Sequence, residues 1–263
     1  MRPVVLITGA SGGIGLELAK IFAEKKQDLV LVARSAQKLE SLQKELTECQ
    51  GVRVDVIPKD LSRREAAREL FEEVRSKGLF VEILVNNAGV GSFGAFAEIE
   101  LSAHENQMDL NMVSLTQLTR LFLQPMLERK RGKIMNVAST AAFQPGPMMA
   151  VYYASKAYVL HLSEALADEL RGSGVTVTAL CPGPTRTGFQ EKADMGGSKL
   201  FRSAVMSAES VAREGYLGLM RGQAVVITGF RNKLLANSAR FAPRSLMTRI
   251  VRKIQEKDKS GLV

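Results

Sequence analysis

TGASGGIG, residues 8–15, separates a short apolar run from a stretch with helical periodicity. Glycines at positions 9, 13 and 15 would let the backbone turn tightly, approach a pyrophosphate closely and pack a helix against a sheet. The phosphates would then face the positively polarised N-terminus of that helix. The segment alone fits either phosphate binding or a tight turn, and its position directly after the first apolar run favours phosphate binding.

The rest of the chain alternates short β-branched runs with longer stretches of helical period. This alternation predicts a parallel sheet connected by crossover helices. The runs consist almost entirely of Val, Ile and Leu, as expected for strands buried on both faces. The predicted strands are 4–8, 29–33, 52–57, 82–86, 133–139, 175–181 and 224–228, and the predicted helices lie near 13–26, 35–49, 62–77, 103–130, 150–171 and 208–221. We therefore predict an α/β fold, a doubly wound parallel sheet of about seven strands with helices on both faces, forming a single domain over residues 1–230.

The composition limits the class of protein. With 263 residues and 46% hydrophobic content, the chain can form one sizeable core. Cys49 and Cys181 lie far apart, without a spacing typical of disulfides or zinc ligands. His104 and His161 both fall on predicted helices, so no metal site is predicted. No segment approaches the ~20 apolar residues that cross a bilayer, and we expect a cytoplasmic protein.

The positive charge is concentrated at the C-terminal end. Residues 231–263 contain nine Lys and Arg against Glu256 and Asp258, a net charge of +7, which leaves +2 of the total +9 for the rest of the chain. Nucleic-acid binding requires clustered cations that face phosphates, so the body is not predicted to bind nucleic acid. We treat residues 231–263 as a basic extension rather than a separate domain.

Part of this extension is predicted to be an amphipathic helix. Over residues 245–257, Leu246, Ile250 and Ile254 are spaced four apart, while arginines and lysines occupy the remaining face. Two interpretations are open. Either the helix lies on the surface of an anionic membrane, or its apolar face packs on the body or on a neighbouring subunit.

The end of the second predicted strand bears on the choice between two dinucleotides. An acidic residue there would accept a hydrogen bond from the ribose 2′-hydroxyl, whereas an arginine accommodates a 2′-phosphate. The strand ends in Ala33 and Arg34 with no acid nearby, which favours NADP(H) over NAD(H); the alternative is an ordinary surface arginine. Asp60, followed by Leu61 and Ser62, comes after the third strand, where it could accept from an adenine amino group or stabilise a turn.

Residues 151–158, VYYASKAY, place two tyrosines beside a lysine. On a helix Tyr152 shares a face with Lys156, whereas Tyr153 is turned ~100° away. Lowering a phenol pKa from ~10 to ~7 takes ~4 kcal/mol, and a cation ~4 Å away supplies about this much at an effective dielectric of ~20. Tyr152 is therefore predicted to exchange a proton near neutral pH. The alternative is a solvated tyrosine and lysine pair.

Other polar residues occupy positions where chemistry is expected. Ser139 ends the fifth strand, and the carboxyl ends of parallel strands line the ligand crevice. Asn111 lies inside an apolar helix, where an amide is unfavourable without a specific partner. The segment CPGPTRT, residues 181–187, offers a rigid turn with Thr185 and Thr187. Each has an ordinary structural explanation, but together and in this order they indicate an active site.

This set of motifs resembles the short-chain dehydrogenase/reductase family, from residue 4 to about residue 230. The family pattern is TGxxxGxG, then NNAG, an Asn on the following helix, a Ser and, thirteen residues later, YxxxK. The corresponding positions here are residues 8–15, residues 86–89, Asn111, Ser139, and Tyr152 with Lys156.

The resemblance implies a Rossmann-like fold and hydride transfer at a nicotinamide. It assigns Tyr152 as the general acid/base and Ser139 as the hydrogen-bond donor to the carbonyl oxygen. Lys156 would bind the ribose and lower the tyrosine pKa, and Asn111 would support a water leading to that lysine. The implied cofactor-binding residues are Gly9, Ser11, Gly12, Gly13, Ile14, Gly15, Arg34, Asp60, Leu61, Asn87, Ala88, Gly89, Tyr152, Lys156, Pro182, Gly183, Thr185 and Thr187. A homodimer or homotetramer is also implied.

The leading hypothesis is an NADP(H)-dependent carbonyl reductase that acts on a ketone or secondary alcohol with an apolar body, such as a 3-oxoacyl chain or a steroid-like ketone. The alternative is an NAD(P)-sensing binding protein without turnover, in which loss of the tyrosine or lysine would be expected, and both are present. An apolar pocket is predicted, covered by a flap over 184–207 and lined by Ser92, Phe93, Phe143, Gln144 and Phe189.

Overall fold

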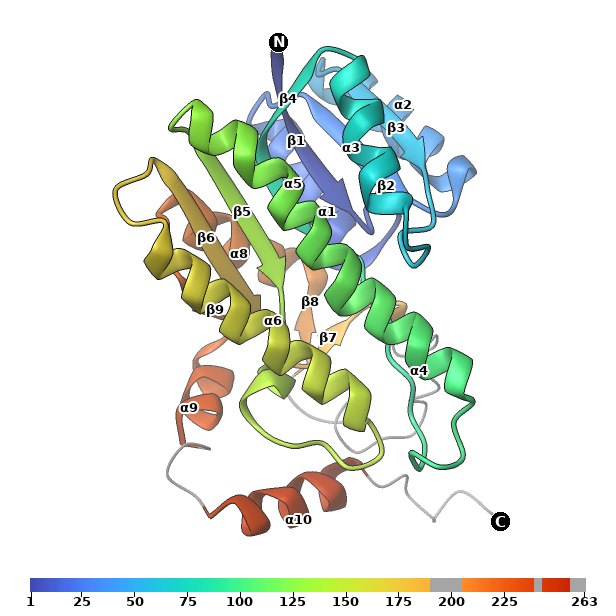
Figure 1. The fold of residues 1–263 in the computed structure, drawn as a ribbon, viewed down its shortest axis with the longest axis vertical. Helices are drawn as coiled ribbons and strands as arrows, with labels where there is room; N and C mark the ends of the chain where they lie inside the picture. Colours follow the sequence, from blue (N-terminus) through green and yellow to red (C-terminus); the bar gives the residue numbers. More distant parts are fainter. Residues whose placement is uncertain (190–204, 239–242, 256–263) are drawn as a thin grey trace.

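The structure is a computed structural model that describes residues 1–189, 205–238 and 243–255. Within these residues, seven parallel strands form one sheet in the order β3-β2-β1-β4-β5-β6-β9 (Figure 1). The strands are β1 (Arg2–Thr8), β2 (Leu29–Ala33), β3 (Val54–Pro58), β4 (Leu79–Asn86), β5 (Gly132–Val137), β6 (Val175–Cys181) and β9 (Val225–Ile227). The predicted fold class, a doubly wound parallel α/β sheet, is confirmed.

The helices cover both faces of the sheet. They are α1 (Gly13–Glu24), α2 (Ala36–Gln50), α3 (Ala66–Ser76), α4 (Leu101–Met108), α5 (Leu115–Glu128), α6 (Ala150–Glu169), α8 (Ala208–Met220), α9 (Phe230–Ser238) and α10 (Arg244–Gln255). α3, α5 and α6 lie in front of the sheet in Figure 1, while α1 and α8 lie behind it. A short parallel pair, β7 (Thr185–Arg186) and β8 (Met206–Ser207), lies beyond the carboxyl ends of the strands.

Strand β1 shows why the strands lack a polar side. Val5 and Ile7 pack into the cluster formed with α1, α2 and α8, whereas Val4 and Leu6 pack into the cluster formed with α3 and α5. All four side chains are at most 1% exposed. Because both faces are covered, the near-continuous apolar sequence is what burial requires.

A chain of buried amides and hydroxyls joins the middle of the sheet to the front helices. Asn86 at the end of β4 donates to Asn136 of β5 at 2.9 Å and to Thr119 of α5 at 3.0 Å. Asn136 in turn donates to Ser163 of α6 at 3.0 Å. A buried amide is costly unless it is hydrogen-bonded, so these bonds fix α5 and α6 in position against the sheet.

Some predicted boundaries differ from the structure. The predicted helix 103–130 is divided, because residues 109–114 form a π-helical turn between α4 and α5. Helix α3 begins at Ala66 rather than at 62, since Asp60 accepts from the backbone N–H of Ser62 and forms a turn there. Helix α9 was not predicted. No helix of the described residues is long and apolar enough to cross a membrane, and no group of three or more His, Cys, Asp or Glu among them could hold a metal ion.

The two cysteines differ in their surroundings. Cys49 of α2 is exposed, whereas Cys181 at the end of β6 is completely buried, and both are free thiols. Burial raises the pKa of the Cys181 thiol to about 12.

The first turn requires glycine at two positions for different reasons. Gly9 has a φ of +66°, in the left-handed region that favours glycine. A Cβ added to Gly15 would lie 2.5 Å from both the Gly9 carbonyl oxygen and Nδ2 of Asn87. At Gly12 nothing lies within 4 Å of an added Cβ, and its φ of 176° is extended backbone.

This difference leads to a matched prediction. Gly15→Ala is expected to lower the free energy of unfolding by about 1–3 kcal/mol, because the new methyl group overlaps the backbone of the preceding turn. Gly12→Ala is expected to change it by less than about 0.5 kcal/mol. Urea denaturation of the wild type and both variants measures the effect, and equal losses for the two variants would contradict the assignment.

Candidate active site

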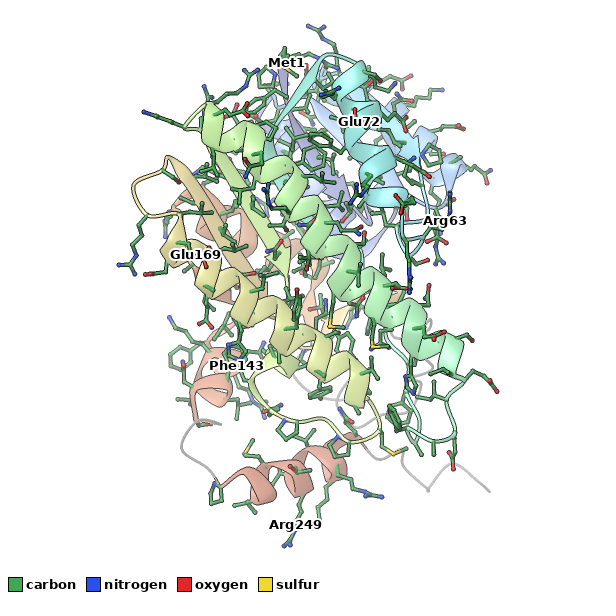
Figure 2. All side chains as sticks on the ribbon, in the orientation of Figure 1. Met1, Arg63, Glu72, Phe143, Glu169 and Arg249 are labelled. Carbon is green, nitrogen blue, oxygen red and sulfur yellow. The ribbon has the colours of Figure 1, made fainter. Side chains whose placement is uncertain are left out.

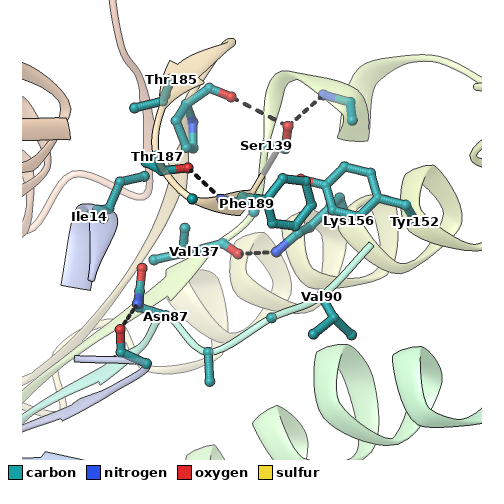
Figure 3. Close-up of a pocket in the computed structure, with 18 of the residues that line it drawn as sticks. Ile14, Asn87, Val90, Val137, Ser139, Tyr152, Lys156, Thr185, Thr187 and Phe189 are labelled. Carbon is teal, nitrogen blue, oxygen red and sulfur yellow. Dashed lines mark hydrogen bonds between the residues drawn. The ribbon is translucent and has the colours of Figure 1, made fainter. Parts of the chain in front are cut away.

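A cavity of about 1270 Å³ lies beyond the carboxyl ends of the strands (Figure 3). It exceeds the roughly 300–1,000 Å³ of ordinary small-molecule pockets, so a dinucleotide and a second molecule fit together. The predicted residues that line it are Gly9, Ser11, Gly12, Gly13, Ile14, Arg34, Asp60, Leu61, Asn87, Ala88, Gly89, Ser139, Tyr152, Lys156, Pro182, Gly183, Thr185 and Thr187. Gly15 and Asn111 do not line the cavity and instead pack behind residues that do.

The ends of β1 and β4 are held together by reciprocal hydrogen bonds. The Thr8 hydroxyl accepts from the backbone N–H groups of Asn87 and Ala88, both at 3.0 Å. The Asn87 side-chain amide donates back to the carbonyl oxygens of Thr8 at 2.9 Å and Gly9 at 3.2 Å. These bonds fix the glycine-rich turn against the segment that follows β4.

The glycine-rich turn suits a pyrophosphate. Gly12 is the N-cap of α1 and no side chain caps this helix, so the first backbone N–H groups of the helix are left for a ligand. The open space around Gly12 lets a bulky anion approach that helix end. The residues therefore fit the phosphates of a dinucleotide.

The far end of the cavity carries more positive charge than the sequence suggested. Arg34 lines it as predicted, and Lys38, four residues later at the start of α2, lines it too. Lys59 also lines it but forms ion pairs with Glu69 at 3.2 Å and Glu73 at 3.6 Å. Lys38 belongs to the first turn of α2, directly after the strand end that carries Arg34, and this position was the signal that could have identified the second cation.

Asp60 stabilises the turn after β3 and also lines the cavity. Its Oδ1 accepts from the Ser62 backbone N–H at 3.1 Å and from the Ser62 hydroxyl at 2.8 Å. Partial burial raises the pKa of Asp60, but the bonds from Ser62 and the charge of Arg34 outweigh it, so the pKa lies below its usual value. The carboxylate therefore stays ionised, and one of its oxygens is committed to the turn.

Ser139, Tyr152 and Lys156 converge on one side of the cavity (Figure 3). The Ser139 hydroxyl accepts from the Ala141 backbone N–H at 3.1 Å and hydrogen-bonds Tyr152. Lys156 is buried, donates from Nζ to the Val137 carbonyl oxygen at 2.8 Å, and lies 5.7 Å from the centroid of the Tyr152 ring.

Burial acts in opposite directions on this tyrosine and lysine. Loss of solvation raises the pKa of Tyr152 to about 12, although the hydrogen bond with Ser139 lowers it. Loss of solvation lowers the pKa of Lys156 to about 8. The expected lowering of the phenol pKa is absent, because desolvation outweighs the hydrogen bond with Ser139, and Lys156 donates to the Val137 carbonyl oxygen.

Asn111 is buried in the π-helical turn and binds protein groups. Its Oδ1 accepts from the Val90 backbone N–H at 3.0 Å, and its Nδ2 donates to the Val90 carbonyl at 2.9 Å and to Ser155 at 3.1 Å. The expectation of a specific partner for this amide is confirmed. Asn111 thereby fixes the segment after β4 against α6, the helix that carries Tyr152 and Lys156.

Comparison with known proteins now identifies the family. A family model described as short chain dehydrogenase matches residues 3–196. The chain belongs to the short-chain dehydrogenase/reductase family. It is therefore an oxidoreductase of the kind that acts on alcohol or ketone groups.

Relatives with assigned names are about one-third identical. A very-long-chain 3-oxoacyl-CoA reductase from Anas platyrhynchos is 34% identical over 183 residues, which span 67% of this chain and 58% of that protein, less than two-thirds of its length. Ketoacyl reductase HetN from Nostoc sp. is 32% identical over 209 residues, 79% of this chain and 72% of the relative. A short-chain dehydrogenase from Sphingobium yanoikuyae, solved in complex with NADPH, is 30% identical with a TM-score of 0.83 and covers 100% of this chain and 99% of its own.

In this short-chain dehydrogenase/reductase, the second tyrosine anchors the C-terminal helix. Tyr153 is 6% exposed, and its hydroxyl accepts from Nε2 of Gln255 in α10 at 2.5 Å. Its ring packs with Met149 and with Val251 of α10. Tyr153 and Gln255 are 102 residues apart, so local sequence patterns could not reveal this contact.

The substrate end is only partly as predicted. Phe189 and Gln144 line the cavity, and the Phe189 ring lies 5.3 Å from the Tyr152 ring. Ser92, Phe93 and Phe143 do not line it; Phe143 lines a second cavity with Glu164. Most of the predicted flap, residues 190–204, lies outside the described residues.

The pKa of Lys156 predicts a pH dependence of stability. In the unfolded chain this lysine titrates near 10.5 and in the folded chain near 8, so the unfolded chain binds more protons between these pH values. Its contribution to the free energy of unfolding therefore rises with pH across that window. We expect the wild type to gain about 1.5–2 kcal/mol relative to Lys156→Met between about pH 8 and 9.5. Urea denaturation at both pH values measures this gain, and parallel profiles would refute it.

Proposed function

We propose that the chain is an NADP(H)-dependent carbonyl reductase that uses Tyr152 as the proton donor. The observation that carries this proposal is the convergence of Ser139, Tyr152 and Lys156 on one cavity with the uncapped, glycine-rich start of α1. Named reductases among the relatives and the NADPH complex among the similar structures support it. A sensor without turnover is disfavoured, since both the phenol and the ammonium are retained.

The proposed residues divide the reaction between them. When bound, NADPH supplies the hydride that reaches the carbonyl carbon. Ser139 would donate a hydrogen bond to the carbonyl oxygen, and the Tyr152 hydroxyl would transfer its proton to the same oxygen, giving the alcohol. Lys156 would hold ribose hydroxyls and stabilise the phenolate that remains. Asn111 acts at a distance, by fixing Val90 and Ser155.

The raised pKa of Tyr152 means that its phenol begins the reaction with a proton to donate. A phenol with a pKa of about 12 is protonated at neutral pH and is ready to donate. Oxidation of an alcohol would instead require Tyr152 to begin as a phenolate, which its buried surroundings disfavour. If the Lys156 ammonium moved closer to the phenolic oxygen, it would stabilise the phenolate and make proton transfer easier in both directions.

The substrate is proposed to have an apolar body, such as a 3-oxoacyl chain or a steroid-like ketone. Phe189, Met149, Leu235 and Ala236 line the same cavity as Tyr152. Apolar walls of this kind gain free energy by burying hydrocarbon and leave the carbonyl as the one group that needs hydrogen bonds.

We also propose that residues 1–230 form the catalytic unit of a cytoplasmic homodimer or homotetramer, with 231–263 as its extension. The free thiols Cys49 and Cys181 suit a reducing compartment. Val113 at 40% exposure and Tyr158 at 41% offer apolar surface for contact between subunits, in the π-helical turn before α5 and on α6.

The tyrosine assignment is tested by a matched pair of variants. Tyr152→Phe is expected to lower kcat for NADPH-dependent ketone reduction by at least ~100-fold, because no other group donates the proton, while the Kd of NADPH changes less than about threefold. Tyr153→Phe loses a hydroxyl of the same kind, bonded to Gln255 instead, and should retain most of kcat. Stopped-flow turnover and fluorescence titration give the two quantities. Similar losses of kcat in both variants would reject Tyr152 as the acid.

Arg34 and Lys38 favour NADP(H) over NAD(H), because both border the end of the cavity beside β2 and α2. Arg34→Asp is expected to raise the Kd of NADPH by roughly tenfold to a hundredfold, the loss of one charge-assisted contact with the 2′-phosphate. The Kd of NADH should not rise. Arg68→Asp, at an exposed arginine of α3 away from the cavity, is the control. A parallel rise for both dinucleotides would contradict the assignment.

A further inference from the structure

Helices α9 and α10 lie beyond the carboxyl ends of the strands (Figure 1). Both helices expose apolar side chains. On α9 the exposed fractions are 85% for Phe230, 61% for Leu234 and 57% for Leu235. On α10 they are 48% for Leu246 and 40% for Ile250. We refer to these residues, together with the exposed arginines and lysines of α9 and α10 named below, as the α9–α10 surface. Phe230 and Leu234 are one turn apart on α9, as are Leu246 and Ile250 on α10, so each helix presents an exposed apolar pair on one side. Exposed apolar groups of this kind often mark an interaction site.

The same surface is strongly basic. Arg231 and Lys233 of α9 and Arg249, Arg252 and Lys253 of α10 are all exposed. Arg249 points away from the body (Figure 2). The sequence contains no acidic residue from 215 to 255, so α9 and α10 themselves carry basic side chains and no acidic ones.

The residues that hold the two helices to the body are different ones. Val251 and Gln255 of α10 are 4% and 0% exposed and pack on Tyr153. Ala236 of α9 is 4% exposed, and Asn232 contacts Gly183 beside the cavity. Leu246 and Ile250 do not belong to the cluster around Tyr153 and Val251, and their exposed apolar surface is available to a partner.

We propose that the α9–α10 surface binds a lipid bilayer that contains anionic lipids. Apolar side chains interleaved with lysine and arginine on helices are the pattern of interfacial membrane binding. The apolar groups would enter the headgroup boundary while the cations face anionic headgroups, each contributing favourably. A second copy of the chain is a poor occupant, because its own basic surface would repel this one.

Because the α9–α10 surface borders the cavity, membrane binding would affect how a substrate reaches the active site. Arg231 and Leu235 of α9 and Lys253 of α10 line the cavity that contains Tyr152. A bilayer bound at the α9–α10 surface would therefore lie beside the cavity, and an apolar substrate dissolved in it could enter without crossing water. This consequence rests on the proposed reductase function, whereas the binding itself does not.

Flotation of the protein with vesicles tests the binding without any turnover. Wild type is expected to float with vesicles of phosphatidylcholine and phosphatidylglycerol and much less with phosphatidylcholine alone. Leu246→Ser combined with Ile250→Ser is expected to reduce the bound fraction relative to free protein by at least about tenfold. Arg249→Glu should reduce it by roughly tenfold or more, and added salt should act in the same direction.

A matched control tests whether vesicle binding is specific to the α9–α10 surface or is a nonspecific effect of any exposed apolar residue. Leu217→Ser combined with Met220→Ser changes apolar residues of α8 that are 50% and 42% exposed, and it should bind vesicles as the wild type does. Circular dichroism and NADPH titration check that each variant is folded. Absence of wild-type flotation, or equal losses in the control, would overturn the proposal. A change of oligomeric state caused by Leu246→Ser and Ile250→Ser would overturn it too, because the occupant would then be a second copy.

Discussion

The close approach of two strand ends, β1 and β4, is the constraint on which the site depends. The Thr8 hydroxyl and the Asn87 amide bond each other's backbone, and this distance is reached only because Gly15 has no side chain. The order of the strands reverses at this point, since the chain moves outward from β1 to β3 and then returns to β4 on the other side. The cavity is therefore a product of topology, and the glycine-rich turn is the local condition that keeps it open beside the start of α1.

Desolvation determines the electrostatics at the other end of the cavity. The same lack of water opposes charge on the phenol of Tyr152 and on the ammonium of Lys156, and so moves their pKa values in opposite directions. The neutral phenol is then the stable form, and Lys156 becomes the group whose charge is most sensitive to its surroundings. A backbone carbonyl, that of Val137, currently accepts from Lys156. Helix α10 completes this wall through Tyr153, so the basic extension contributes to the shape of the site.

The sequence predicted features that depend on short spacings. The seven strands are visible because each is a local apolar run, and the spacing of thirteen positions from Ser139 to Tyr152 brings motif residues to one cavity wall. Contacts between distant segments were not predictable, as the bond from Gln255 to Tyr153 illustrates. The π-helical turn around Asn111 depends on an amide that bonds both backbone groups of Val90, and helical periodicity carries no sign of it. The hydrogen bond from Lys156 to the Val137 carbonyl was not predictable, because Val137 lies on β5, 19 residues before Lys156.

Because Cys49 is exposed and Cys181 is buried, the folded protein can be labelled with a dye at one cysteine alone. A maleimide dye meets Cys49 on the outside of α2, whereas Cys181 is enclosed at the end of β6 and stays protonated. The native fold thus accepts a single fluorophore without any engineered cysteine, and a denatured molecule accepts two. The stoichiometry of labelling therefore counts folded molecules directly.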